Sequence, residues 1–140
     1  MQLNPYLFFN GNCEAAFKFY EQCLGGKIVT MMTYENAPTP QQKPSELPAN
    51  WDGKIMHVCL AIGDFRLTGS DCPPHLFEGT KGFSVQISID DPAKAERIFH
   101  ALAENGTVKM PYGPTFWSLR FGMLVDKFGI PWMIGCDKAA

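Results

Sequence analysis

The chain has 140 residues, a formal net charge of −2, and 46% hydrophobic residues. This length and composition are typical of one globular domain with a substantial core, and they argue against an intrinsically disordered chain. The small acidic charge, with no basic stripe, argues against nucleic-acid binding, and no apolar run reaches the length of a membrane span.

The cysteines indicate a reducing compartment. They are odd in number and scattered, at Cys13, Cys23, Cys59, Cys72 and Cys136. No C-x-x-C pair is present, so neither a disulfide framework nor a zinc knuckle is predicted. The N-terminus lacks the charged-then-apolar pattern of a signal peptide. We therefore expect a cytoplasmic protein.

The first half of the chain predicts a strand, a helix and three more strands. The expected strands lie at residues 2–9, 27–34, 54–62 and 65–70. Asn12 is the expected N-cap of a helix over residues 13–24, which Gly25 ends in the left-handed conformation. Residues 35–53 contain four prolines among polar residues, so we expect a long loop there.

The second half repeats this order. Its expected strands lie at residues 83–89, 107–112, 116–125 and 130–134, after an irregular piece at 71–81. Asp91 and Pro92 open a helix that Asn105 and Gly106 end. The last two strands are joined by a tight turn from Asp126 to Gly129, in which the carboxylate accepts backbone N–H groups.

The two halves therefore indicate an internal repeat. A shift of 80 residues places Phe19 on Phe99, Gly26 on Gly106 and Ile28 on Val108. The helix entry turns then differ by one residue. The predicted fold class is α+β, with two βαβββ modules at about residues 1–72 and 82–137.

Four local motifs carry a resemblance to a known family. They are Pro5-Tyr6-Leu7, Ala16-x-x-Phe19-Tyr20-x-x-x-Leu24-Gly25, Gly69-Ser70-Asp71, and Phe116-Trp117 followed by Asp126-Lys127-Phe128-Gly129-x-Pro131-Trp132. Together with the repeated module they resemble the PhnB-like branch of the vicinal oxygen chelate superfamily, the fold of glyoxalase I, dioxygenases and bleomycin-resistance proteins. The resemblance implies cup-shaped mixed sheets with helices on their convex face, a small-molecule ligand and a homodimer.

The resemblance also implies where a divalent metal would be bound. The corresponding positions are Pro5, Ser84, Met133 and one residue between Gly69 and Asp71. Pro5 has no donor atom, Ser84 is a poor ligand, and Met133 offers only a soft thioether. We therefore expect no cofactor and no metal at the usual positions.

Strand alternation predicts which side chains face a ligand. The apolar members, expected toward the helices, are Met56, Val58, Leu60 and Ile62, and Trp117, Leu119, Phe121, Met123 and Val125. The candidate ligand-binding residues on the other side are His57, Cys59, Ser70, Ser84, Gln86, Ser118, Arg120 and Met133. His57 suits a hydrogen-bonding role or a general base, and Arg120 suits either a clamp for an anionic ligand or an ion pair with Asp71.

Two functions follow from the resemblance. The first is a metal-independent small-molecule-binding protein of the glyoxalase and bleomycin-resistance type, with an unknown and possibly anionic ligand. The alternative is a glyoxalase-like lyase or isomerase with an atypical metal set, such as His57 with Asp71 or Glu35. Some PhnB-like proteins are labelled as methyltransferases. This sequence has no glycine-rich loop that follows a strand and opens a helix, so it does not support a methyl-donor site of that kind. A ligand-free interaction module is the third possibility.

Overall fold

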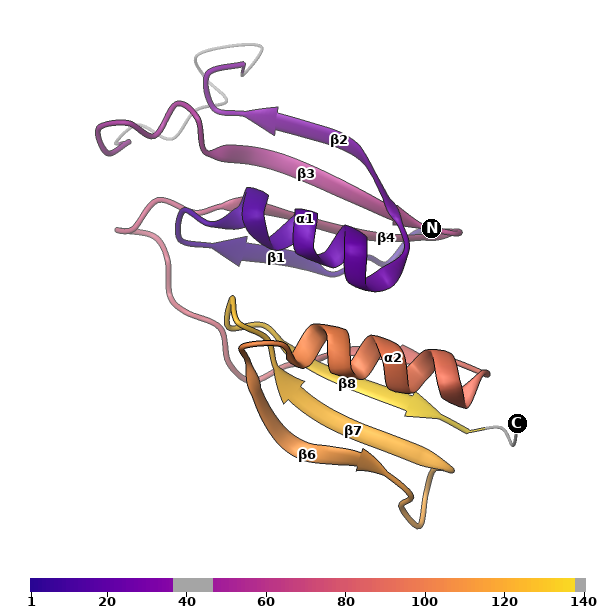
Figure 1. Ribbon diagram of the computed structural model, residues 1–140. Helices are drawn as coiled ribbons and strands as arrows, with labels where there is room; N and C mark the ends of the chain where they lie inside the picture. The colour runs from indigo at the N-terminus through magenta and orange to yellow at the C-terminus, as the bar shows by residue number, and fades with distance from the viewer. Residues whose placement is uncertain (37–46, 138–140) are drawn as a thin grey trace. The chain divides into compact units, whose positions relative to one another are not determined.

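The chain forms two compact units, Met1–Gly79 and Thr80–Ala140. The computed structural model describes residues 1–36 and 47–137, and both units follow the order strand, helix and three strands (Figure 1). The predicted α+β class and its two βαβββ modules are therefore confirmed. No helix in the described part of the chain is long and apolar enough to cross a membrane.

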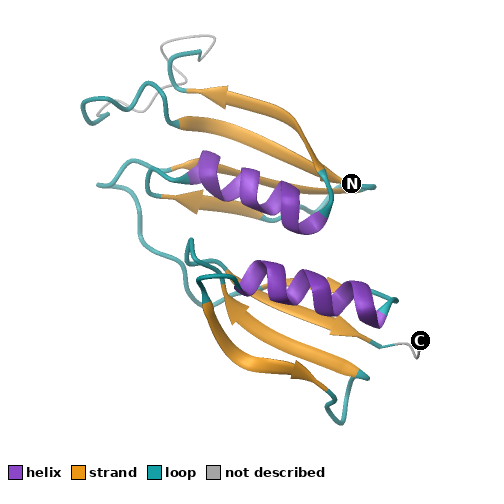
Figure 2. Ribbon diagram, viewed as in Figure 1, coloured by secondary structure: helices purple, strands orange, loops and turns teal. Residues whose placement is uncertain are grey.

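Unit 1 is a four-stranded sheet with one helix. Its elements are β1 (Tyr6–Phe9), α1 (Cys13–Leu24), β2 (Lys27–Thr33), β3 (Ile55–Ile62) and β4 (Phe65–Asp71). The sheet order is β1-β4-β3-β2, with β1 parallel to β4 and the other neighbours antiparallel. The helix lies across one face of this sheet (Figures 1 and 2). Of the long loop expected at 35–53, residues 37–46 lie outside the described part of the chain.

Unit 2 has the same topology. Its elements are β5 (Val85–Ser88), α2 (Pro92–Ala103), β6 (Thr107–Gly113), β7 (Arg120–Val125) and β8 (Pro131–Cys136). The sheet order is β5-β8-β7-β6, with β5 parallel to β8. As predicted, the Asp91 carboxylate accepts the backbone N–H of Ala93 at the start of α2, and Pro92 is the first helical residue.

The repeat is real, but the one-residue difference lies elsewhere than predicted. A shift of 79 residues relates β1 to β5 and α1 to α2, whereas a shift of 80 residues relates β2 to β6. The extra residue therefore follows α2 and does not precede it. Gly26 and Gly106 occupy matching places: an added Cβ would lie 2.5 Å from the carbonyl O of Ala61 and 2.4 Å from that of Val125. Both positions require glycine, because an added Cβ would clash with a carbonyl oxygen of a neighbouring strand, which cannot move away as a flexible side chain could.

The core of unit 1 lies between α1 and the sheet. Ala16, Phe17 and Tyr20 of the helix are fully buried, whereas Phe19 is only half-buried. Tyr20, and not Phe19, therefore matches the buried Phe99 of α2 under the shift of 79. The predicted match of Phe19 with Phe99 was wrong. Aromatic residues occupy three of the four positions 17–20, so the sequence alone allows more than one alignment of the two helices.

The final hairpin contains the main correction to the predicted sheet faces. The strand begins at Arg120, so residues 116–119 lie outside it, and Trp117 is 51% exposed. Gly122 lies under α2, since an added Cβ would meet the Phe99 ring at 2.6 Å. The set with Phe121, Met123 and Val125 was predicted to face the helix, and it faces away. The Phe99 ring of α2 occupies the space that a side chain at position 122 would fill, so glycine is the residue that fits under the helix there.

The turn at Asp126 has the predicted chemistry. One carboxylate oxygen, Oδ1, accepts the N–H groups of Phe128 at 2.8 Å and Ile130 at 3.0 Å. The other oxygen accepts the indole N–H of buried Trp132 at 2.8 Å. Gly129 has φ = 89°, the left-handed value that the turn requires. The motif that marks the family therefore closes β7 onto β8.

Candidate functional site

The sheet of unit 1 has one face under α1 and one face turned away from it. The buried residues under the helix are Leu7, Phe9, Val58, Leu60 and Leu67. Strand register places the alternate residues of these strands on the other side, because directly paired residues share a face. Six of them, Tyr6, Phe8, His57, Cys59, Thr68 and Ser70, are called the open face of unit 1.

Tyr6 and His57 form a hydrogen-bonded, stacked pair on the open face of unit 1. The Tyr6 hydroxyl lies 3.2 Å from Nδ1 of His57, and the two ring centroids are 5.8 Å apart at an interplanar angle of 27°. Phe8 adds a third ring, with its centroid 5.2 Å from that of Tyr6. Tyr6 and Phe8 are 42% and 54% exposed. Three flat groups are thus presented to solvent with polar atoms at their edge, an arrangement typical of ligand sites.

Asp71 is buried and is used by the backbone. Its Oδ1 accepts the N–H groups of Gly11 and Cys13, and its Oδ2 accepts that of Ile55, all three at 2.9 Å. It thus caps the start of α1, where the predicted N-cap Asn12 makes no side-chain hydrogen bond. Burial raises the pKa of Tyr34, so its phenol remains a donor to the Asp71 carbonyl O at 2.6 Å. Asp71 is therefore a structural junction between β4, β3 and α1.

The metal set of His57 and Asp71 is not brought together. His57 belongs to the open face of unit 1, whereas Asp71 pairs with buried Phe9 on the side of α1. Within the described residues, no three His, Cys, Asp or Glu side chains are grouped so that they could hold a metal ion. Glu35 is exposed in the loop after β2. His57 and Asp71 therefore do not converge in the described part of the chain, as the ligands of a hard divalent cation must.

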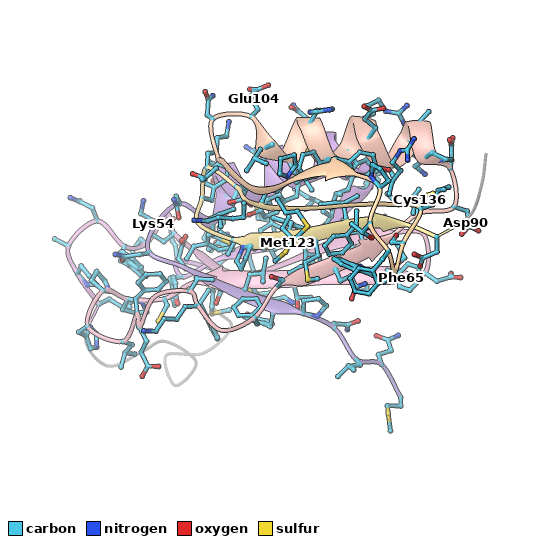
Figure 3. The ribbon with its side chains drawn as sticks, turned by 90° about the horizontal axis from the view of Figure 1, so that it is seen from below. Lys54, Phe65, Asp90, Glu104, Met123 and Cys136 are labelled. Carbon is cyan, nitrogen blue, oxygen red and sulfur yellow. The ribbon has the colours of Figure 1, made fainter. Side chains whose placement is uncertain are left out.

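Unit 2 carries a row of methionines on the face away from α2. Met110 pairs with Met123, Met123 with Met133, and Met133 with Gln86. All three methionines are half-buried, and Met123 lies on the side of its sheet away from the helix (Figure 3). We call Gln86 and the three methionines the open face of unit 2. Thioethers form adaptable, polarisable walls for ligands.

Two predicted site residues are not on this face. Arg120 pairs with buried Cys136, three residues from Met123 along the strand, so it has the opposite orientation to Met133. Its guanidinium is exposed, and Nη1 donates to the carbonyl O of Leu119. Ser118 is buried, with Oγ 2.7 Å from the Arg120 carbonyl O and 3.0 Å from that of Cys136. Ser118 therefore holds the strand ends together.

The structure thus divides the predicted site between two faces. His57, Cys59 and Ser70 share the open face of unit 1, and Gln86 and Met133 share that of unit 2. Ser84 precedes β5 by one residue and is half-buried. Sequence reasoning missed Tyr6 and Met123. The signal for Tyr6 was the alternation of exposed and buried residues in β1, which an unbroken apolar run conceals.

A family model described as 3-demethylubiquinone-9 3-methyltransferase matches residues 1–135. The chain belongs to this family. Protein YjdN of Escherichia coli strain K12 is 33% identical over 142 residues, covering 99% of this chain and 97% of the relative. Membership therefore extends over nearly the whole sequence.

Solved structures place the family within a wider fold. Protein PA1353 from Pseudomonas aeruginosa is 46% identical, with a TM-score of 0.88 over 99% of both chains. The PhnB protein of Bacillus cereus, at 24% identity, has a TM-score of 0.77 over 97% of this chain and 99% of its own. A glyoxalase/bleomycin resistance protein/dioxygenase family enzyme from Burkholderia phytofirmans shares the fold, with 15% identity and a TM-score of 0.62 over 96% of each chain. The resemblance to the PhnB-like branch of the vicinal oxygen chelate superfamily is therefore confirmed at the level of the fold.

Proposed function

We propose that this protein binds a small organic molecule against the open faces of its sheets, without a metal at the positions usual for the superfamily. The observation that carries the proposal is the Tyr6–His57 pair, a hydrogen-bonded stack exposed on a sheet face that its own helix does not cover. Exposed aromatic rings beside polar edges bind flat ligands by stacking and by directed hydrogen bonds. The methionine row of unit 2 supports the same function, since thioethers contact aromatic rings favourably.

The chemistry of the donor atoms supports the metal-independent form of the proposal. The Asp71 carboxylate has both oxygens occupied by backbone N–H groups. Met133 has thioether neighbours on one side and an amide on the other. A thioether is a poor ligand for Mg²⁺ or Mn²⁺. The metal-dependent lyase or isomerase is favoured by no comparable feature.

The other expectations enter as parts of the proposal. We expect a cytoplasmic homodimer that binds neither nucleic acid nor membrane. The five cysteines all lie in the described part of the chain and none is in a disulfide, which suits a reducing compartment. The net charge of −2 gives little attraction for polyanions.

A thermal-shift screen followed by calorimetry tests the proposal. The compounds are aromatic carboxylates, phosphonates and amides, with S-adenosylmethionine included because of the family description. A ligand at 100 times its Kd should stabilise the fold by about 2.7 kcal/mol. We expect a hit that binds wild type and the His100→Ala control equally and binds His57→Ala at least tenfold more weakly.

Three results would contradict the proposal. One is a screen in which no compound raises the melting temperature at millimolar concentration. Another is a hit whose affinity is unchanged in both His57→Ala and Met123→Ala. The third is near-stoichiometric Mn²⁺, Zn²⁺ or Ni²⁺ retained by the purified protein together with a rise in melting temperature, which would restore the metal-dependent alternative. Binding of S-adenosylmethionine would favour methyl transfer.

A further inference from the structure

The Tyr6–His57 contact has a chemical direction. A phenol is a good hydrogen-bond donor and a weak acceptor, because its oxygen lone pair is delocalised into the ring. The unprotonated nitrogen of a neutral imidazole is a strong acceptor. The favoured arrangement at 3.2 Å is therefore the Tyr6 hydroxyl donating to Nδ1 of His57.

This direction determines where the imidazole proton lies. When Nδ1 accepts, the proton of the neutral ring is on Nε2, since the hydrogen bond at one ring nitrogen determines the tautomer. The stacked geometry, with centroids 5.8 Å apart, also restrains the plane of the His57 ring. Nε2–H then becomes an oriented donor on the open face of unit 1.

Three polar side chains near His57 already make hydrogen bonds elsewhere. The Thr68 hydroxyl donates to the Pro5 carbonyl O at 2.6 Å, and the Tyr6 hydroxyl is used by His57. Arg66, at the hairpin end of β4, donates through Nη1 to the carbonyl O atoms of Gly63 and Phe65. The imidazole N–H beside the exposed Tyr6 and Phe8 rings is thus positioned to be a directional hydrogen-bond donor on this face.

We propose that Tyr6 is a positioning residue that holds His57 as the Nε2–H tautomer, so that the open face of unit 1 recognises a flat ring bearing a hydrogen-bond acceptor oxygen. This deepens the proposed function and rests on it for the ligand class. The acceptor can be a neutral carbonyl or a carboxylate, since both accept one N–H bond. Tyr6 lies outside the set predicted from the sequence.

Nitrogen-15 NMR of the imidazole rings tests the tautomer without any ligand. The chain has three histidines, so removal of His75 and His100 leaves the signals of His57 alone. Spectra are recorded at a pH where the imidazoles are neutral, with His75 in wild type as the reference for an exposed ring that averages both tautomers. We expect Nδ1 of His57 at the pyridine-type limit. In Tyr6→Phe this signal should move toward the averaged position of His75, although the ring stack is kept.

The ligand class is tested with two probes, benzamide and benzoate, titrated onto the same labelled protein. We expect at least one probe to shift the Nε2–H signal of His57, with at least fivefold weaker binding in Tyr6→Phe. The Phe65→Leu control, whose exposed ring lies at the start of β4, should bind like wild type. Benzoate alone would identify an anionic ligand, and benzamide alone or both would identify the acceptor oxygen as the recognised group.

The outcomes separate this inference from the function on which it rests. A pyrrole-type Nδ1 signal in wild type, or a signal that Tyr6→Phe leaves unchanged, overturns the inference even if the protein binds other compounds. The predicted tautomer with no response to either probe overturns the ligand class. If the screen described above also finds no ligand, the proposed function fails with it.

Discussion

Replacing Asp71 by Asn tests whether this residue is a structural junction or a metal ligand. Three backbone N–H groups, those of Gly11, Cys13 and Ile55, donate to its carboxylate at 2.9 Å, and Asp71 is 1% exposed. An amide has one acceptor oxygen, so its NH₂ group must face at least one of these donors. A hydrogen bond to a charged group contributes about 1.5–3 kcal/mol, and a buried donor without a partner costs a further 1–3 kcal/mol. We expect Asp71→Asn to lower the free energy of unfolding by roughly 2–4 kcal/mol.

The assay is urea denaturation followed by circular dichroism, in a buffer that contains EDTA. The control is Asp91→Asn, because Asp91 makes one exposed N-cap bond and Asn caps about as well as Asp. The midpoint should fall clearly for Asp71→Asn and remain close to wild type for the control. The reasoning is refuted if Asp71→Asn is as stable as wild type in EDTA, and more so if a divalent cation stabilises wild type but not the variant.

Two further perturbations test the packing and the electrostatics of the fold. Gly122→Ala places a Cβ 2.6 Å from a ring carbon of α2 and should destabilise by about 1–3 kcal/mol in the same assay, whereas Gly113→Ala, where an added Cβ meets nothing within 4 Å, is the control; equal midpoints would contradict the assigned sheet face. Burial, and secondarily the Asp71 charge, raise the pKa of the Cys13 thiol above its ordinary value of 9.0, so the neutral thiol is favoured in the folded state. Its contribution to stability is therefore complete below pH 9 and is lost as the pH rises above it, by up to about 1.4 kcal/mol per pH unit. Urea midpoints above pH 9 should fall less steeply for Cys13→Ala than for wild type, and parallel slopes would contradict this prediction.

The position of Asp71 shows why a motif can be found while its role is missed. Gly69-Ser70-Asp71 stands out in the sequence as a family motif, and a carboxylate on a strand suits metal binding. In the structure Gly69 admits the Phe17 ring at 2.8 Å from an added Cβ, and Asp71 caps α1 from a strand 58 residues away. No local pattern reveals a helix cap supplied from so far along the chain. Asn12, the local candidate, makes no capping hydrogen bond with its side chain.

The faces of β7 show a second limit of the sequence pattern. Alternation assigned Met123 to the core because it is apolar, and placed Arg120 beside the ligand because it is charged. The structure reverses both assignments relative to α2, since Gly122 and buried Leu124 lie under the helix. Alternation along a strand separates its side chains into two sets, one for each face of the sheet. Choosing the more apolar set as the one that faces the helix fails here, because a small residue, Gly122, is required under α2.

Local chemistry was sufficient for the order of the elements, for several helix ends and for the last turn of this protein, and it indicated that the two halves repeat. Helix ends at Gly25 and Pro92 and the Asp126 turn depend on residues close in sequence, whose backbone preferences act before tertiary contacts form. Only the tertiary structure brought Tyr6 to His57, because their pairing requires β1 and β3 to meet opposite sides of β4. The candidate site is therefore a product of sheet order, which arises from contacts between residues about 50 positions apart.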